Sequence, residues 1–274
     1  MKFALISLGC SKNLVDSENF IGILVNKRGF EVTSELGEAD IIIVNTCGFI
    51  GDAKKESIET ILEVSDLKIN GNLKKIIVTG CLAQRYAGEI LKELPEVDAV
   101  IGTGEIDKIE KVIEEVLADK RVVESTKMDF LADSETDRVL TTASHTAYLK
   151  IAEGCDRKCT YCIIPQLRGN LRSRTIEDIL KEANKLVASG VRELNLLAQE
   201  TTEYGIDLYK EKSLARLMKE LVKIDGLKWL RTYYMFPDSL TDELIDVMKT
   251  EEKICKYFDI PVQHISDNIL QQMG

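Results

Sequence analysis

Three cysteines near the middle of the chain have the spacing of a metal-binding loop. Cys155, Cys159 and Cys162 are separated by three and then by two residues, so a short loop can turn all three thiols inward. Three thiolates are one fewer than a structural zinc site takes, and one fewer than electron-carrying iron–sulfur clusters usually take. A cubane iron–sulfur cluster held by this loop would keep one iron open to a small molecule. A zinc knuckle that borrows a fourth ligand from elsewhere is the alternative.

The composition predicts a globular protein of about two domains. The chain has 274 residues, of which 45% are hydrophobic, enough for packed cores. Seven cysteines in an acidic chain without a usable export signal indicate reduced thiols that bind metal, so we expect a cytoplasmic protein without disulfides. The apolar run at the start is shorter than the roughly seven to fifteen residues of an export signal. No run approaches the about 18 residues of a membrane helix, so we expect no membrane partner.

Charge is distributed unevenly along the chain. The 36 basic and 46 acidic residues give a net charge of −10, which argues against general wrapping of nucleic acid. A basic rim around the cysteine loop would attract an anionic cofactor or an acidic substrate segment. An ordinary solvated charge cluster is the alternative. The stretch from 141 to 174 has six basic residues (Lys150, Arg157, Lys158, Arg168, Arg172 and Arg174) and two acidic ones (Glu153 and Asp156), or +4 locally.

A second set of cysteines follows a repeated pattern near the start of the chain. A short apolar strand, a small turn, a cysteine and a helix recur in that order, and the cysteines are Cys10, Cys47 and Cys81. Continuous apolar strands alternating with helices indicate a parallel sheet covered on both faces, with ligands at the carboxyl ends of its strands. If the three strands are neighbours, their thiols meet in a second three-thiol metal site. Three small buried hydrophobic residues are the alternative.

The first domain is predicted to span residues 1–118, and residues 119–143 are predicted to be a charged, weakly periodic connector. Apolar runs predict strands at 3–6, 41–44, 76–78 and 97–102, and one further short strand in the connector near 121–123. Helices are predicted at 17–27, 54–66, 82–94 and 106–117.

The second domain is predicted to span residues 144–274 and to contain four strand–helix units, the layout of a βα barrel or part of one. The predicted fold class is therefore α/β: a parallel-sheet domain followed by a partial βα barrel. Thr175, with Asp178 three residues later, forms a capping-box pattern that predicts a helix start. Strands are predicted at 147–152, 193–197, 230–235 and 257–262, and helices at 176–187, 214–224, 242–249 and from 267.

The two cysteine sets, in this order, resemble those of the methylthiotransferases, a family of radical S-adenosylmethionine enzymes. The resemblance covers nearly the whole chain. The sequences around the cysteines are most similar to the ribosomal-protein branch (RimO type), whereas the transfer-RNA branch (MiaB type) usually has different runs after its first two cysteines and is the alternative. The segments that carry this similarity are 9–18, 45–50, 164–169 and 198–205.

The resemblance implies two 4Fe–4S clusters, one on Cys10, Cys47 and Cys81 and one on the later set, with S-adenosylmethionine as cofactor. In the implied reaction, a 5'-deoxyadenosyl radical takes a hydrogen from an aspartate of small-subunit ribosomal protein S-twelve. The earlier cluster supplies the sulfur, and a second S-adenosylmethionine supplies the methyl group. A radical is needed because a saturated carbon beside a carboxylate is beyond side-chain bases. The implied partners are the ribosomal protein or ribosome, an electron donor and a sulfur source; no side chain is assigned as catalytic.

Three further residues are predicted to bind the cofactor. Gln199 ends the second predicted strand of the later domain, where related enzymes bind the amino group of the cofactor, and a purely structural role is the alternative. Tyr161 lies between two cysteines and would shield the cluster or contact adenine. His264 follows the fourth predicted strand. Cys255, on a predicted helix end, is interpreted as a free thiol without a role.

Relatives of this kind continue past a motif like that at 261–264 with two further strand–helix units and a small C-terminal β-barrel domain. That domain engages the ribosomal or RNA partner and is absent from the 274 residues. We therefore expect a fragment or a truncated product. A non-catalytic iron–sulfur carrier or scaffold is a further alternative from a different functional class.

Overall fold

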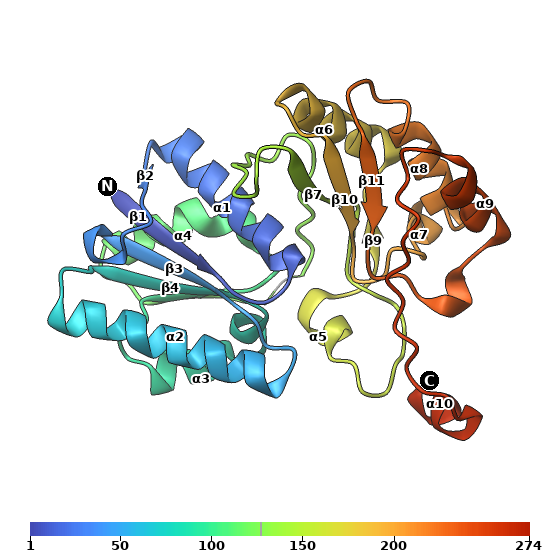
Figure 1. The fold of residues 1–274 in the computed structure, drawn as a ribbon. Helices are drawn as coiled ribbons and strands as arrows, with labels where there is room; N and C mark the ends of the chain where they lie inside the picture. The colour runs from blue at the N-terminus through green and yellow to red at the C-terminus, as the bar shows by residue number, and fades with distance from the viewer. Residues whose placement is uncertain (127) are drawn as a thin grey trace. The chain divides into compact units, whose positions relative to one another are not determined.

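The computed structural model describes residues 1–126 and 128–274, which form two compact units (Figure 1). Unit 1 contains residues 1–130, 136–139 and 166–168. Unit 2 contains residues 131–135, 140–165 and 169–274. The predicted connector therefore contributes residues to both units. The three residues 166–168 belong to unit 1 although they follow the later cysteine loop in the sequence.

Unit 1 is built on a six-stranded parallel sheet with the strand order β2-β1-β3-β4-β5-β6. β3 and β4 pair over six residues, from Ile41 with Lys75 to Thr46 with Gly80. Residues 41–44 and 76–78 are completely buried, which explains why these strands are continuous apolar runs. The strands are β1 (Lys2–Ser7), β2 (Glu31–Val32), β3 (Ile41–Thr46), β4 (Lys75–Gly80), β5 (Ala99–Ile101) and β6 (Val122–Glu124).

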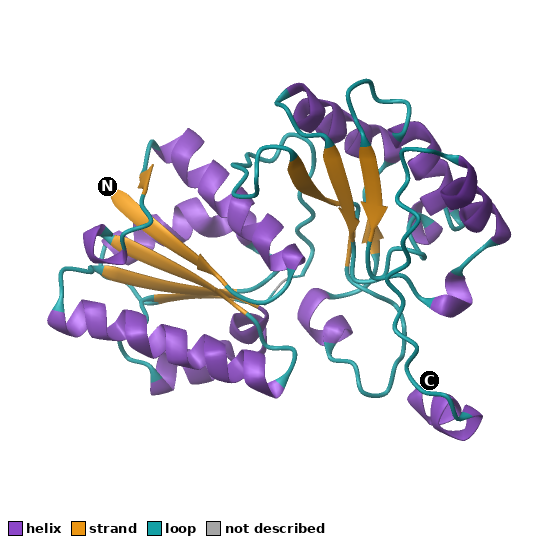
Figure 2. Ribbon diagram, viewed as in Figure 1, coloured by secondary structure: helices purple, strands orange, loops and turns teal. Residues whose placement is uncertain are grey.

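Helices cover both faces of this sheet (Figure 2). α1 (Ser11–Arg28) and α4 (Ile109–Leu117) pack on Ile41, Ile43 and Ile77. α2 (Gly51–Asn70) and α3 (Cys81–Glu93) pack on the opposite face, against side chains such as Ile42 and Val78. Two short 3-10 helices, η1 (Leu36–Glu38) and η2 (Ile106–Lys108), complete the unit. α1 begins six residues earlier than predicted, and the strand predicted near 121–123 is β6, an edge strand of the sheet.

Unit 2 contains a three-stranded parallel sheet with the order β11-β10-β7 and a separate antiparallel pair, β8 with β9. Its main core lies between the sheet and the helices α6, α8 and α9. The strands are β7 (Thr146–Lys150), β8 (Ala152–Glu153), β9 (Arg172–Ser173), β10 (Glu193–Leu197) and β11 (Trp229–Thr232). The helices are α5 (Ile164–Arg168), whose last three residues belong to unit 1, α6 (Ile176–Ala188), α7 (Ile206–Tyr209), α8 (Leu214–Leu221), η3 (Pro237–Ser239), α9 (Asp242–Thr250) and α10 (Asp267–Met273).

The start of α6 shows half of the predicted capping box. The Thr175 hydroxyl accepts a hydrogen bond from the Asp178 backbone N–H at 3.3 Å, which confirms Thr175 as the N-cap. The Asp178 carboxylate instead accepts from the Ser134 backbone N–H at 2.8 Å and pairs with Arg174. The Asp178 carboxylate therefore connects the segment before β7 to α6.

The predicted fourth strand of the second domain, at 257–262, is wrong. Residues 257–266 carry no strand in the structure, and Val262 is 78% exposed. The segment contacts the sheet at single points, such as the Met235 N–H donating to the Asp259 carbonyl oxygen at 3.0 Å. Parallel strands persist when both of their faces are covered, and Tyr257 and Phe258 are also exposed here. The described residues of unit 2 therefore form three of the four predicted strands.

Within residues 1–126 and 128–274, no helix combines the length and the hydropathy that crossing a bilayer requires.

Candidate functional site

The first cysteine set lies at the carboxyl ends of three adjacent strands. Cys10 follows β1 and is the N-cap of α1, Cys47 follows β3, and Cys81 is the first residue of α3. β1, β3 and β4 are neighbours in the sheet, as the sequence pattern predicted. Cys47 and Cys81 are each 9% exposed, and all three cysteines are free thiols. Metal ligation by these thiols stays a prediction.

Two glycines allow the cysteine loops to touch. A Cβ on Gly9 would lie 2.7 Å from the Cys47 Cβ, and Gly9 has a φ of +84°, which L side chains rarely adopt. A Cβ on Gly48 would lie 2.9 Å from the carbonyl oxygen of Cys81. The loops that carry Cys10, Cys47 and Cys81 are therefore in direct contact.

Buried polar side chains hold these loops in place. The Asn13 side-chain amide donates to the carbonyl oxygens of Leu8 and Thr46, both at 3.0 Å. The Asn45 amide donates to the Asn13 carbonyl oxygen at 2.8 Å and to the Ser17 hydroxyl at 2.9 Å. Asn13 and Asn45 lie in the segments 9–18 and 45–50 that carry the family resemblance, but neither was predicted to have a role. The available signal for Asn45 is a polar residue inside an otherwise apolar strand.

Arg168 lies in this region of unit 1, as the last residue of α5. Its guanidinium pairs with the Asp16 carboxylate at 2.7 Å and donates to the Asn13 side-chain oxygen at 2.5 Å. Burial raises the pKa of the Cys81 thiol, and the Arg168 guanidinium opposes that rise through its charge and a hydrogen bond. The N-termini of α1 and α3, at Cys10 and Cys81, also favour negative charge.

Three of the six basic residues that were predicted to form a rim around the later cysteine loop do not form one. Lys150, Arg168 and Arg174 are each about 5% exposed or less and pair with carboxylates, so they are not free to attract an anion. The sequence count of charges between 141 and 174 missed their partners because most lie elsewhere in the chain. The pairs are Lys150 with Glu153, Arg168 with Asp16, and Arg174 with Asp178 and Glu182.

The second cysteine set lies on the loop that follows β8 in unit 2. Cys155, Cys159 and Cys162 are partly buried. The Ile164 backbone N–H donates to the Cys162 sulfur at 3.5 Å, and the Arg157 backbone N–H donates to the Cys155 thiol. Burial raises the pKa of both thiols, and these backbone hydrogen bonds oppose the rise. Backbone donors aimed at sulfur favour thiolates, the form that binds metal.

Among the described residues, no three His, Cys, Asp or Glu side chains are close enough to hold one metal ion. A single ion needs ligand atoms within about 2.0–2.6 Å of one centre. In a cubane each thiolate binds its own iron, so the thiolates stand further apart. Ligation of a cluster or of a single ion by either set of cysteines stays a prediction.

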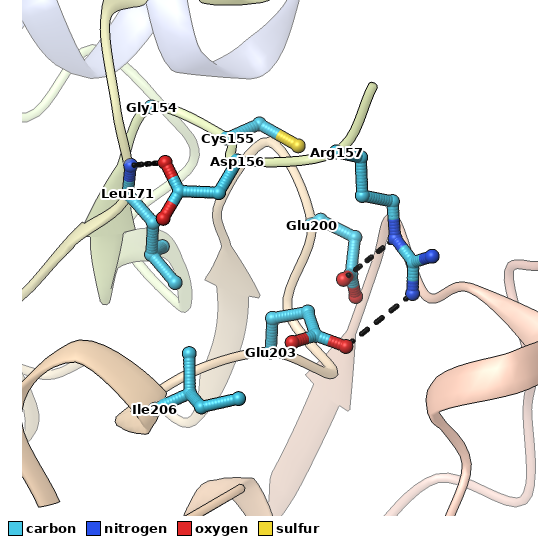
Figure 3. Close-up of a pocket in the computed structure, with 8 residues that line it drawn as sticks. All are labelled: Gly154, Cys155, Asp156, Arg157, Leu171, Glu200, Glu203 and Ile206. Atoms are coloured by element: carbon cyan, nitrogen blue, oxygen red, sulfur yellow. Dashed lines mark hydrogen bonds and ion pairs between the residues drawn. The ribbon is translucent and has the colours of Figure 1, made fainter. Parts of the chain in front are cut away.

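A pocket of about 170 Å³ lies beside Cys155 (Figure 3). The Arg157 guanidinium pairs with Glu200 at 3.2 Å and with Glu203 at 3.4 Å, and it stacks 3.6 Å from the centre of the Phe236 ring. One cation and three carboxylates thus line a small cavity next to a thiol, and the carboxylate of Asp156 accepts from the Leu171 backbone N–H at 3.0 Å. The pocket is lined by Gly154, Cys155, Asp156, Arg157, Leu171, Glu200, Glu203 and Ile206.

The two glutamates of the pocket differ in their pKa. Burial raises the pKa of Glu200, and a hydrogen bond from Thr202 and the charge of Arg157 only partly oppose it. Burial also acts to raise the pKa of Glu203, but a hydrogen bond from Ser239 and nearby positive charges lower it overall. Both glutamates lie in the segment 198–205, which carries the family resemblance, but neither was predicted to have a role. Their place directly after the strand 193–197 was the available signal.

The predicted cofactor residues lie in different surroundings. The Gln199 amide donates to Glu153, while its side-chain oxygen is buried without a hydrogen-bond partner in the described part of the chain. Tyr161 is 54% exposed and donates to the Gln263 side-chain oxygen at 2.7 Å. His264 is exposed and follows no strand, so its predicted position at a strand end is wrong. A cofactor-binding role for each stays a prediction.

Cys255 is not on a helix end, contrary to the prediction, because α9 ends at Thr250. It follows the isolated bridge between Leu230 and Ile254, and its backbone N–H donates to the Leu230 carbonyl oxygen at 2.9 Å.

A parallel α/β domain with three cysteines, followed by a βα domain with a Cys-x3-Cys-x2-Cys loop, defines a radical S-adenosylmethionine protein with an additional N-terminal domain. The Radical SAM superfamily model matches residues 149–274, and the model described as Uncharacterized protein family UPF0004 matches residues 2–102. Two solved structures of the radical S-adenosylmethionine methyltransferase TsrM from Kitasatospora setae have a similar fold. Their TM-scores are 0.63 and 0.64 at 11% and 13% identity, over 100% of this chain and 62% and 64% of theirs.

Curated relatives match the whole chain. It is 54% identical over 274 residues to "Ribosomal protein uS12 methylthiotransferase RimO" of Clostridioides difficile, and 56% identical to the protein of the same name from Lachnoclostridium phytofermentans. It covers 62% of the length of each. These matches confirm the resemblance to the methylthiotransferase family of radical S-adenosylmethionine enzymes that was found in the sequence. The match to the Radical SAM superfamily model implies S-adenosylmethionine and a 4Fe–4S cluster as cofactors.

Proposed function

We propose that this chain provides the two iron–sulfur sites of a methylthiotransferase that modifies an aspartate of ribosomal protein uS12. The observation that carries the proposal is the presence of two separate three-thiol sets, one in each unit. The similarity to curated proteins named uS12 methylthiotransferase supports the substrate. Because the chain spans about three fifths of the length of those relatives, the activity is proposed for the protein to which this chain contributes.

In unit 2, Cys155, Cys159 and Cys162 would hold the cluster that binds S-adenosylmethionine. When bound, this pair supplies a hydrogen-abstracting radical, formed after one electron from a reductant cleaves the cofactor. The loop contributes thiolates whose charge is stabilised by the backbone N–H groups of Arg157 and Ile164. The protein therefore contributes ligation and orientation, and the cofactors carry the difficult chemistry.

The pocket beside Cys155 would bind the amino-acid end of the cofactor. Its carboxylates, Glu200 and Glu203, suit an ammonium group, and Arg157 suits a carboxylate. A volume of about 170 Å³ is below the roughly 300–1,000 Å³ of pockets that enclose a whole ligand, so the pocket would hold one end of the cofactor. Gln199 does not line this pocket, but its side-chain oxygen, which is buried without a partner in the described residues, would be a further acceptor for the ammonium group.

In unit 1, Cys10, Cys47 and Cys81 would hold the second cluster, which would present the sulfur. Asn13 and Asn45 orient the loops, and the low exposure of Cys47 and Cys81 limits access of water. The electron donor and the sulfur source would be separate partners of the protein.

The test begins with anaerobic reconstitution of the chain. Two cubanes predict about eight irons per chain. Replacing Cys10, Cys47 and Cys81 by alanine should leave about four irons and retain reductive cleavage of S-adenosylmethionine. Replacing the later set should also leave about four irons but abolish the cleavage. A preparation that binds only zinc would contradict the proposal.

The substrate is tested in a strain that lacks the gene. Mass spectrometry should show that uS12 loses the mass of a methylthio group while transfer RNA keeps its methylthio modification. Loss from transfer RNA instead would assign the protein to the other branch of the family.

A further inference from the structure

Arg168 is a buried cation that lies against the first cysteine set. It is 3% exposed, and Asp16 and Asn13 on the first turns of α1 fix its guanidinium at 2.7 and 2.5 Å. The residue before it is also anchored in unit 1, because the Thr103 hydroxyl donates to the Leu167 carbonyl oxygen at 2.5 Å. The guanidinium is therefore held in one orientation by two side chains and a fixed backbone.

The same group lies close to the thiol of Cys81. The Asn13 side-chain oxygen accepts both from Arg168 at 2.5 Å and from the Cys81 thiol at 3.9 Å, so the guanidinium and the thiol share one partner. The positive charge of Arg168 favours the thiolate form of Cys81. Cys81 is 9% exposed, and a charged thiolate at such a position is costly unless an opposite charge accompanies it. Arg168 meets this requirement.

A second arginine of unit 1 that pairs with a carboxylate of α1 provides a comparison. Arg138 pairs with Glu18 at 2.6 Å, and the two side chains are 9% and 0% exposed. Glu18 is two residues after Asp16, and side chains two apart on a helix point in different directions. Asp16 and Glu18 on α1 thus each pair with an arginine from another part of unit 1, and Arg168 is the arginine whose charge acts on Cys81.

We propose that Arg168 is a positioning residue of the cluster site in unit 1: its guanidinium, held by Asp16 and Asn13, supplies the positive charge that raises the reduction potential of a cluster bound to Cys10, Cys47 and Cys81. The inference rests on the proposed function, since it requires a cluster at that site. A cation near a cluster favours the reduced form, which carries one more negative charge, and net charge and hydrogen bonds to sulfur are among the factors that set cluster potentials.

The test uses the full chain with Cys155, Cys159 and Cys162 replaced by alanine, so that only the cluster of unit 1 remains. This parent should bind about four irons, and its midpoint potential is measured by a redox titration followed by electron paramagnetic resonance. Arg168→Met should shift the potential to more negative values, and Asp16→Asn should shift it to more positive values. Arg168→Lys should restore most of the parent potential, and Arg138→Met should leave the potential unchanged.

Opposite shifts distinguish an electrostatic role from a structural one, because a structural role would disturb the cluster in both variants alike. A potential for Arg168→Met equal to that of the parent, or shifts of the same sign in both variants, would overturn the inference. If Arg168→Met does not fold, the double variant Arg168→Met with Asp16→Asn removes both buried charges. Its potential should still be more negative than that of the parent, because the charge of Arg168 acts on the Cys81 thiol. A potential equal to that of the parent would also overturn the inference. A parent that binds no iron would instead refute the proposed cluster of unit 1.

Discussion

Ser57 hydrogen-bonds both backbone polar groups of Cys47. The Cys47 N–H donates to the Ser57 hydroxyl at 3.0 Å, and the hydroxyl donates to the Cys47 carbonyl oxygen at 3.1 Å. Ser57 is completely buried on α2, and Cys47 lies in the turn after β3. Buried backbone groups require partners, and a side chain from the neighbouring helix provides them here. This contact fixes the position of one predicted cluster ligand.

We predict that Ser57→Ala lowers the free energy of unfolding of the chain by about 1–3 kcal/mol, because two buried backbone groups lose their partner. Urea unfolding under anaerobic conditions measures the change. The same variant should lose iron faster to a chelator. Thr60→Ala on the same helix is the matched control, since its hydroxyl bonds the Glu56 carbonyl oxygen within α2, and it should change the free energy by no more than about 0.5 kcal/mol. Equal stability of Ser57→Ala and the wild type would show that the contact contributes nothing.

We predict that Gly9→Ala destabilises the chain by roughly 1–3 kcal/mol because of the positive φ alone. The added Cβ would also lie 2.7 Å from the Cys47 Cβ, so the cysteine must move. Iron bound per chain after reconstitution should fall, and thermal unfolding measures the stability. Gly37→Ala is the control, because a Cβ there meets no atom within 4 Å. Full iron content in Gly9→Ala would mean that the loops tolerate a wider separation.

We predict that Gln199→Leu weakens binding of S-adenosylmethionine about tenfold or more, since a hydrogen bond to a charged group contributes about 1.5–3 kcal/mol. The buried oxygen of Gln199, which lacks a partner in the described residues, is the proposed acceptor. Equilibrium dialysis with the reconstituted protein measures the affinity. Asn195→Ala on β10, the strand that precedes Gln199, removes an amide that donates to Thr146 at 2.9 Å, and it should leave the affinity unchanged. Unchanged binding in Gln199→Leu would assign Gln199 a structural role.

We predict that Glu200→Gln and Glu203→Gln change the pH dependence of stability in opposite directions. The pKa of Glu200 is raised above its ordinary value of 4.5, chiefly by burial, so Glu200 contributes stability at low pH that is lost as pH rises through its folded-state pKa. Relative to wild type, Glu200→Gln should therefore gain stability as pH rises above 4.5. The pKa of Glu203 is lowered below 4.5, so its contribution is present above that pH and lost as pH falls through the folded-state pKa. Glu203→Gln should therefore lose stability relative to wild type as pH rises towards 4.5.

Urea unfolding of the wild type and the two glutamine variants, at a series of pH values on both sides of 4.5, measures these dependences. Parallel curves for the two variants would contradict the assigned pKa directions.

The sequence alone determined the parts of the fold that rest on local burial. The runs at 41–44 and 76–78 are apolar at every position because both faces of the parallel sheet are covered. These apolar runs predicted the strands. The order of strands and cysteines predicted that Cys10, Cys47 and Cys81 meet at one edge of the sheet. The loop of Cys155, Cys159 and Cys162 was equally evident, because its spacing is a local property of the chain. The resemblance to the methylthiotransferase family followed from the same residues.

The tertiary structure alone decided which residues surround these cysteines. Arg168 was counted with a basic rim around the later loop, yet it is buried with Asp16, which lies 152 positions earlier. The predicted strand at 257–262 has suitable residues but lies exposed, and Glu200 and Glu203 form a pocket with Arg157 that no periodicity indicates. The local order of polar and apolar residues indicates whether a side chain prefers to be buried. Ion pairs, pockets and the covering of a strand by other elements depend instead on contacts between residues far apart in the sequence.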